Sequence, residues 1–564
     1  MRLYPIGSLL LPLSLVTACQ DDGVVNDEVG ATSNDETGDG DGDGDGDGDG
    51  DGDGDGDGDG DGDGDAPLHA IFVQSDNVDQ HRELIAIDIS DPLVAGAPEV
   101  LVSRAAEDQL SIVPSGPTPF GAWQVTHQVG STTTSSLLRL DAEGFDMSPM
   151  LPEGGPTYGI RGLFTPTGDA LLVLAKPEPQ GSHHVLWVPY VDEAPTEATD
   201  LTPTLGPDAH FDRMVMSPDG THVAFALAET EGHTYGIYLV ELGVEPGAEP
   251  GAPLLVDTRT YEVPVHLHLR LTDEALAYDY DIDDDGVADI LVRDLDDPLA
   301  PAVQVTTQVA GSETIRDQWS VDGSKLLYWT GSEFSAGELY LVELVDGQPQ
   351  APVLLSTPDM PASISAFGFD PNGDAFYTFS DGDDARGLAH VALSGGVPAA
   401  PVQISEALPA DHFFQMGPVG EWLGYTAGVA SDIHVALIGF DQDGPLEPLT
   451  VFEGFDGGTI GIELPEVGSR LVVQASIQGT PRVASVDLDD PALTPAWLDD
   501  GLPAGWEPSF GVTLSPDEQQ AFIILRPIDG IDEMLMRVPV DGSGPLQQLT
   551  PGGSDISKVY LTAP

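Results

Sequence analysis

The chain has 564 residues, of which 96 are acidic and 18 are basic, so its formal net charge at pH 7 is −78. Phosphate recognition needs clustered lysine and arginine, and this balance therefore argues against binding to nucleic acid or to an anionic membrane surface. Apolar residues make up 40% of the chain, enough for a large core, and its one cysteine rules out internal disulfide bonds.

The first eighteen residues, Met1–Ala18, have the features of a signal peptide. One basic residue, Arg2, precedes an apolar run over Leu9–Val16, which is far below the roughly 20 residues of a membrane-spanning helix. The residues that end at Cys19 resemble a bacterial lipobox, which implies cleavage before Cys19 and its lipidation. Gln20 then favours the outer over the inner membrane. The alternative is an ordinary secretory signal followed by a chance cysteine.

Residues 19–66 are predicted to form a disordered acidic linker. After Cys19 this segment contains no basic residue, and it includes fourteen Gly-Asp pairs over Gly38–Asp65. Glycine supplies flexibility, and evenly spaced carboxylates repel one another and keep the chain extended. Fully stretched, the linker reaches about 150 Å. We interpret it as a tether that holds residues 67–564 away from a lipid surface.

A turn-and-strand unit is best preserved at residues 216–242. Ser217–Gly220 has the sequence of a type I turn, with proline second and glycine fourth. Val223, Phe225 and Leu227 then alternate with smaller residues, as in a strand, and Tyr235–Leu242 is a second apolar strand. Such a unit cannot bury its own faces, so it must stack on neighbours.

The second apolar strand recurs ten times at intervals of 45 to 53 residues. Its copies lie at residues 84–87, 137–140, 185–188, 237–240, 290–292, 339–342, 388–391, 433–436, 483–486 and 535–538. The repeat resembles that of TolB-like and WD40-like β-propellers. We therefore predict an all-β fold, a propeller of about ten four-stranded blades over residues 67–564. Two smaller propellers, or eight or nine blades, are the alternatives.

The two ends of the repeat region complement each other. The first module begins at His69–Val73, which already corresponds to the second strand of a blade. Lys558–Pro564 resembles the missing first strand. The C-terminal strand is therefore expected to complete the first blade and close the ring, which hides exposed strand edges.

One loop has the spacing of a calcium site. Asp281, Asp283, Asp285 and Asp289 occupy positions 1, 3, 5 and 9, with glycine at position 6 and the carbonyl of Val287 at position 7. The pattern resembles the calcium loop of integrin-type propeller blades, and the resemblance carries the ligand roles to these five residues. We predict Ca²⁺ in a structural role. The alternative is a solvated acidic hairpin.

Local catalytic motifs are missing from the sequence. It has no Gly-x-Ser-x-Gly elbow, no P-loop, no dinucleotide fingerprint and no cysteine–histidine pair. The histidines at 183–184, 266 and 268 lack further ligands at local spacing, so they do not predict zinc.

The favoured function is a non-enzymatic scaffold, a lipid-anchored propeller of the cell envelope that binds a protein or glycan partner. The only membrane contact expected is through the lipidated N-terminus. The first alternative is a polysaccharide or peptide lyase or hydrolase with its site in the propeller channel, because such sites are assembled from distant loops. The second alternative is a calcium-dependent adhesin.

Overall fold

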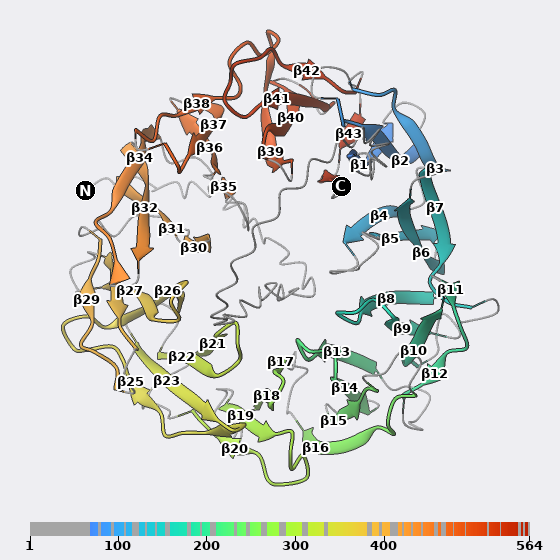
Figure 1. Cartoon of the computed structure of the whole chain (residues 1–564), viewed down its shortest axis with the longest axis vertical. Coiled ribbons are helices and arrows are strands. Elements are labelled where there is room, and N and C mark those ends of the chain that lie inside the picture. The colour runs from blue at the N-terminus through green and yellow to red at the C-terminus, as the bar shows by residue number, and fades with distance from the viewer. Residues whose placement is uncertain are drawn as a thin grey trace, which may run out of the picture. The chain divides into compact units, whose positions relative to one another are not determined.

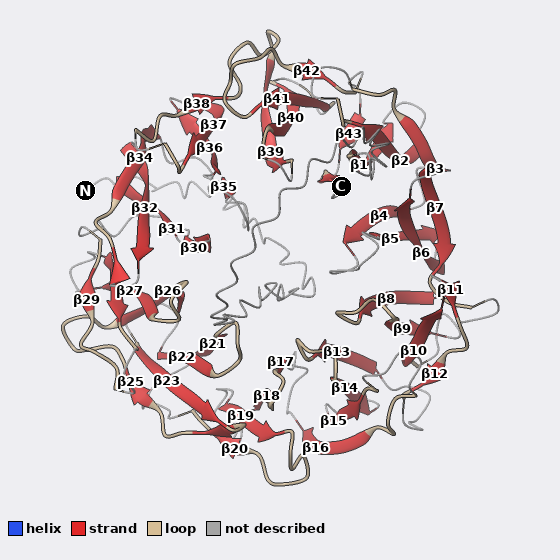
Figure 2. Ribbon diagram, viewed as in Figure 1, coloured by secondary structure: helices blue, strands red, loops and turns tan. Residues whose placement is uncertain are grey.

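A computed structural model describes residues 68–561 apart from short connecting segments. The segments left out are 77–80, 92–94, 106–108, 115–122, 130–131, 142–143, 153–157, 177–181, 192–193, 203–209, 230–233, 244–248, 261–267, 281–288, 307–313, 332–336, 381–385, 394–396, 406–415, 420–421, 430–431, 442–443, 456–460, 464–469, 478, 491, 516–517, 529, 531, 551–553 and 557–558. Every regular element in the described ranges is a β-strand (Figure 2). No helix there has the length and apolar character of a membrane span.

The strands form ten antiparallel sheets, which we number as blades 1 to 10 in chain order. Together they make one ten-bladed β-propeller, which confirms the predicted fold class and excludes two smaller rings (Figure 1). In blades 2 to 10 the first strand lies nearest the centre of the ring and the last strand lies at its rim. We call these first strands the inner strands.

Blades 1 to 5 take their strands from the first half of the described chain, except for two strands near the C-terminus. Blade 1 contains β1 (His69–Asp76), β2 (His81–Asp88), β3 (Glu99–Ala105), β43 (Ser554–Ile556) and β44 (Tyr560–Leu561); blade 2, β4 (Gln109–Pro114), β5 (Trp123–Val129), β6 (Thr132–Asp141) and β7 (Gly144–Pro149); blade 3, β8 (Tyr158–Phe164), β9 (Ala170–Lys176), β10 (His184–Val191), β11 (Ala194–Pro195) and β12 (Thr199–Asp200); blade 4, β13 (His210–Met216), β14 (His222–Glu229), β15 (Thr234–Glu241) and β16 (Leu254–Thr260); and blade 5, β17 (Leu269–Leu271), β18 (Ala275–Tyr280), β19 (Asp289–Asp294) and β20 (Val303–Gln304).

Blades 6 to 10 follow the same order. Blade 6 contains β21 (Thr314–Trp319), β22 (Lys325–Gly331), β23 (Glu338–Val345), β24 (Gln348–Pro349) and β25 (Val353–Leu354); blade 7, β26 (Ala362–Phe369), β27 (Ala375–Ser380), β28 (Arg386–Val391) and β29 (Val402–Gln403); blade 8, β30 (Met416–Val419), β31 (Trp422–Val429), β32 (Asp432–Asp441), β33 (Gly444–Pro445) and β34 (Leu449–Phe455); blade 9, β35 (Gly461–Glu463), β36 (Arg470–Ile477), β37 (Thr480–Asp487) and β38 (Ala496–Trp497); and blade 10, β39 (Trp506–Leu514), β40 (Gln520–Pro527), β41 (Met534–Pro539) and β42 (Gln547–Gln548).

The core of the propeller lies between the blades, because both faces of each sheet are covered. On β14 the large residues Val223, Phe225 and Leu227 pack against blade 3, and the small residues Ala224 and Ala226 pack against blade 5. Each of the ten interfaces has its own cluster of buried apolar side chains. Burial of apolar area therefore stabilises the ring as a whole rather than any single blade.

The turn predicted in blade 4 is present. The amide of Gly220 donates to the carbonyl of Ser217 over 2.9 Å, and Gly220 has a φ of 72°. Glycine adopts this left-handed conformation without the steric cost that a side chain brings. The hydroxyl of Ser217 lies 2.7 Å from a carboxylate oxygen of Asp219 and accepts a hydrogen bond from the amide of His222 over 2.9 Å. This turn joins the inner strand to the second strand of the blade.

The ring closes as the sequence predicts. Both β43 and β44 pair antiparallel with β1, and Tyr560 lies opposite Ile71. A buried apolar cluster joins blade 10 to blade 1. Arg537, on β41, crosses the same boundary and donates from Nη1 to the carbonyls of Ile89 and Asp91 over 3.2 and 2.8 Å. Strand pairing within blade 1 thus joins the two ends of the chain, and apolar packing and hydrogen bonds join blade 10 to blade 1.

Candidate functional site

The turn after the inner strand of blade 7 has an acidic first residue. Asp370 replaces the serine of the blade 4 turn, and one of its carboxylate oxygens accepts hydrogen bonds from the amides of Asn372 and Asp374, both over 2.9 Å. The amide of Gly373 donates to the carbonyl of Asp370 over 2.9 Å, which is the same backbone hydrogen bond as in the blade 4 turn. The second oxygen of Asp370 is left to face a neighbouring strand.

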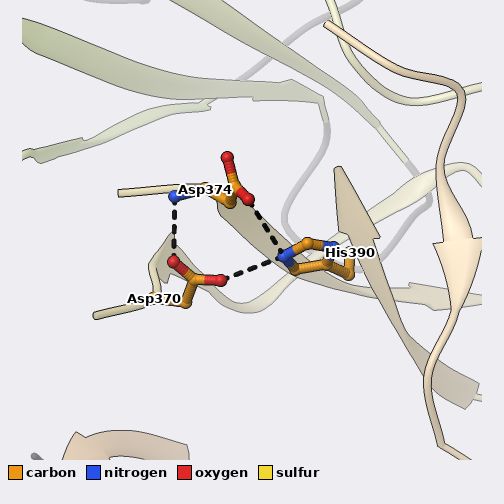
Figure 3. A group of neighbouring side chains, drawn as sticks. All are labelled: Asp370, Asp374 and His390. Carbon is orange, nitrogen blue, oxygen red and sulfur yellow. Dashed lines mark hydrogen bonds and ion pairs between the residues drawn. The ribbon is translucent and has the colours of Figure 1, made fainter. Parts of the chain in front are cut away.

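That neighbouring strand is β28, which places His390 beside the turn (Figure 3). Nε2 of His390 lies 2.9 Å from Oδ2 of Asp370 and 3.8 Å from Oδ2 of Asp374. Oδ1 of Asp374 accepts a hydrogen bond from the amide of Leu393 over 2.6 Å. The side chains of Asp370 and His390 are 0% and 7% exposed, and that of Asp374 is 15% exposed. Three polar side chains thus converge at a site between strands that is almost completely buried from solvent.

This Asp-Asp-His group has the donor set and spacing of a metal site. One potential ligand atom from each residue lies within 4.8 Å of the other two. In each carboxylate, Oδ1 accepts hydrogen bonds from the backbone and Oδ2 faces the imidazole nitrogen. Ligating carboxylates are commonly oriented in this way. Imidazole and carboxylate together suit Zn²⁺ and other first-row divalent ions.

Local motif spacing did not reveal this group, because His390 follows Asp370 by twenty residues and reaches it only through the sheet. A signal was nevertheless present in the repeat. The Asp-Pro-Asn-Gly turn places an acid where the blade 4 turn has Ser217. The strand register of blade 7 pairs His390 with Phe376, and at the equivalent place in blade 4 Leu239 pairs with Ala224. The signal in the sequence is that Asp370 and His390 replace Ser217 and Leu239 at two positions of the repeat that are in contact.

The predicted calcium loop lies almost wholly outside the described residues. Asp281, Asp283, Asp285 and Val287 belong to the segment 281–288, and only Asp289 is described. Asp289 is 1% exposed. Its Oδ1 accepts hydrogen bonds from the Gln304 amide over 2.8 Å and the Thr306 hydroxyl over 2.7 Å. The last carboxylate of the motif is therefore held by the rim side of blade 5. The predicted lipidation site, Cys19, also lies outside the described residues.

Ionisable residues gather at the inner edge of blades 5 and 6. His268 directly precedes β17, Asp279 lies opposite it on β18, and Asp317 is on the neighbouring β21. The amide of His268 donates to the Asp279 carboxylate over 2.7 Å, and Trp319 Nε1 donates to the Asp317 carboxylate over 3.1 Å. Burial raises the pKa of Asp279 to about 6; the positive charge of His268 and its amide oppose this rise, and the charge of Asp317 adds to it.

No protein-family model and no curated protein matches the chain. Among solved structures it is similar to a eukaryotic initiation factor, with 12% identity, a TM-score of 0.45, and coverage of 88% of this chain and 99% of that one. Prolyl oligopeptidase B from Galerina marginata is 14% identical with a TM-score of 0.34, and the coverage is 75% of this chain and 56% of the peptidase. An oligogalacturonate lyase in complex with manganese is 12% identical with a TM-score of 0.32, and the coverage is 67% and 99%. The chain spans just over half the length of the prolyl peptidases that it matches. No residue role follows from these similarities.

Proposed function

We propose that the protein is a lipid-anchored scaffold of the cell envelope whose propeller binds a partner at the inner edge of the ring. One observation carries the proposal: ionisable side chains collect on or directly before the inner strands of blades 4 to 6, whereas the interfaces between those blades are apolar. Of these side chains, His268 and Arg316 are exposed. A closed ring presents residues from several blades toward one centre, which suits recognition of a partner by many separate contacts.

The test of the scaffold is capture of its partner. The tagged full-length protein is crosslinked in its native envelope and purified with and without untagged residues 67–564 as competitor. A recurrent protein or glycan that the competitor displaces supports the scaffold. Recovery of the same abundant envelope proteins with and without competitor would overturn it.

The cellular location of the protein forms part of the same proposal. Cleavage before Cys19 and lipidation of its thiol would anchor the chain, and the Asp-Gly linker would give the propeller its reach. Incorporation of labelled palmitate, together with outer- and inner-membrane fractionation, tests both points. Label in the wild type and none in Cys19→Ser is the expected result. Equal labelling of the two would contradict lipidation at this residue.

We also propose that Ca²⁺ binds the blade 5 hairpin in a structural role through Asp281, Asp283, Asp285, the Val287 carbonyl and Asp289. Buried Asp289 supports the proposal, since neutral donors orient its carboxylate, as is common for carboxylates that bind metal ions. Isothermal titration with Ca²⁺ should give one site that is lost in Asp283→Asn and retained in His390→Leu. Zn²⁺ or Mn²⁺ binding with the opposite pattern would place the metal at the Asp-Asp-His group instead.

An enzyme is the second candidate function, and the gathering of His268, Asp279 and Asp317 at the inner edge favours it. A histidine beside two carboxylates can move protons in a lyase or hydrolase reaction on a polysaccharide or peptide. Product formation from panels of such polymers, abolished in His268→Gln while the melting temperature is unchanged, would establish it. Full turnover in that variant would remove His268 from catalysis.

A further inference from the structure

Three arginines and one histidine occupy one repeated position, on the inner strand or directly before it, in four consecutive blades. In each case the residue lies four positions before the first residue of the turn. The set is Arg161 in blade 3, Arg213 in blade 4, His268 in blade 5 and Arg316 in blade 6. The sheet register agrees, because Arg161, Arg213 and Arg316 pair with Leu174, Ala226 and Trp329, at equivalent places on the second strands. We call these four residues the basic arc.

The arc is unusual for this chain, which has only 18 basic residues against 96 acidic ones. Three arginines elsewhere in the described ranges pair with carboxylates of their own blade: Arg470 with Asp487, Arg482 with Asp499 and Arg526 with Glu507. Arg213, which is half-buried, and Arg316, which is exposed, make no hydrogen bond or ion pair with any described residue. Within the described part of the chain, nothing therefore pairs with these two guanidinium groups.

The strands that carry the arc are also open sheet edges. Each of β8, β13 and β21 stands at the end of its sheet and pairs only with the second strand of its blade. Figure 1 shows all three strands on the inner side of the ring. An open edge offers a row of backbone N–H and C=O groups to an extended chain. The inner strands of blades 4 and 6 thus combine backbone hydrogen-bonding groups with the guanidinium groups of Arg213 and Arg316.

We infer that the basic arc binds an extended acidic peptide segment of a partner protein; this rests on the proposed function, since it names the partner of the same inner edge. A peptide that adds alongside β13 or β21 places a side chain directly opposite Arg213 or Arg316, with Cβ atoms about 5 Å apart. A glutamate or aspartate there meets a planar guanidinium that can bind its carboxylate through two hydrogen bonds. The open strand edge binds the peptide backbone, and the arginines select its acidic side chains.

The net charge of the chain does not prevent this binding. Charges farther away than the Debye length, about 8 Å at physiological ionic strength, are largely screened, so the local potential depends on the arc and on the nearby Asp279 and Asp317 rather than on the net charge. A peptide also suits the acidic residues nearby, because its backbone amides can donate to the half-buried carboxylate of Asp317. An anionic polysaccharide can pair with the guanidinium groups but cannot add as a strand, which separates the two ligand classes experimentally.

The test is fluorescence anisotropy with the purified full-length protein and a labelled peptide of alternating glutamate and threonine. We expect binding that weakens as salt is raised, and no binding to the matched peptide in which glutamine replaces glutamate. Arg213→Gln and Arg316→Gln should each raise Kd about tenfold, which corresponds to loss of one charged hydrogen-bonded contact of about 1.4 kcal/mol. Arg213→Lys should recover only part of the loss, because lysine keeps the charge but not the planar fork.

The matched control is Arg104→Gln on β3, which removes the same charge from an exposed rim strand and should leave Kd unchanged. Strand addition is tested with two peptides, each N-methylated on one of the two alternating sets of residues. The N–H groups of these two sets lie on opposite edges of the extended peptide, and only one edge pairs with the inner strand. One of the two methylated peptides should therefore lose binding. Equal binding of both N-methylated forms, or tighter binding of polygalacturonate than of the peptide, would overturn the inference. A captured envelope partner that binds Arg213→Gln and Arg316→Gln as well as wild type would overturn it too while leaving the scaffold intact. If no partner is captured, the scaffold itself fails.

Discussion

Blades 4 and 7 make the same turn with different chemistry. In blade 4 the neutral hydroxyl of Ser217 bonds the turn, and Leu239 fills the adjacent place on the third strand. In blade 7 the carboxylate of Asp370 bonds the turn and also contacts His390. The backbone hydrogen bond across the turn is 2.9 Å long in both blades. The two blades therefore keep the same backbone hydrogen bond across the turn with different side chains, and in blade 7 those side chains are buried ionisable groups.

The largest expected effect comes from replacing His390 by the leucine of blade 4 while Asp370 is kept. His390→Leu removes the partner of a fully buried carboxylate, and breaking such a pair costs about 3–5 kcal/mol. The double variant Asp370→Ser with His390→Leu recreates the blade 4 arrangement and should recover most of the loss. Denaturant midpoints of the wild type, both single variants and the double variant measure the coupling. Equal destabilisation in His390→Leu and the double variant would refute it.

The fourth residue of the turn tests how tightly each turn meets its neighbouring blade. A Cβ on Gly220 would lie 2.6 Å from Pro166 Cδ, whereas a Cβ on Gly373 would meet only Lys325 Nζ, at 3.4 Å. Both glycines have positive φ, so alanine is strained at either position. We expect a loss of about 2–3 kcal/mol for Gly220→Ala and about 1 kcal/mol for Gly373→Ala. Similar losses in thermal melts would show that contact between blades does not matter here.

The blade 4 turn should also depend on pH through Asp219. Burial disfavours its ionised form, but hydrogen bonds from Ser217 and Thr221 outweigh burial and lower the pKa of Asp219 below 3.8. The ionised carboxylate therefore stabilises the fold above pH 3.8, and this contribution is lost as the pH falls through the lowered pKa. Because Asp219 is exposed, we expect Asp219→Asn to cost only about 0.5–1 kcal/mol at neutral pH. The difference in stability from wild type should vanish in strong acid; persistence there would contradict the assignment.

The smallest effect is expected in blade 10, whose turn ends in Glu518 rather than glycine. Glu518 has a φ of 53°, a conformation that costs an L-residue more than it costs glycine. Glu518→Gly should raise stability by about 0.5 kcal/mol, because relief of strain slightly exceeds the added entropy of the unfolded chain. Glu518→Ala retains the strain and serves as the control. A gain in the alanine variant would point to charge rather than backbone conformation.

Most of the fold was predictable because its signals are local. The apolar strand at residues 237–240 and its copies each coincide with the third strand of a blade, and the Ser217–Gly220 turn lies where its sequence places it. Even the long-range closure was predictable, since the chain end supplies the strand that the first module lacks, and Tyr560 pairs with Ile71. Repetition converts one local pattern into a global architecture.

The candidate site was less predictable because it depends on contacts across the sheet. Asp370 and His390 belong to different strands, and their approach follows from register rather than from spacing along the chain. The basic arc is likewise visible only when the inner strands are aligned by their turns. The calcium prediction at Asp281 remains a prediction, and the structure adds to it only that Asp289 is buried and hydrogen-bonded.

Closure of blade 1 by β43 and β44 has a consequence for the order in which the chain folds. Within blades 2 to 10 every strand pairs with a near neighbour in sequence, so each sheet can form soon after its residues are available. Blade 1 instead pairs Asp76 with Ser554, which is the contact with by far the greatest loop-closure entropy. Until that contact forms, the free edge of β1 is open to other chains. The first blade to be synthesised is thus the last to be finished, and conditions that slow its completion should favour aggregation over refolding.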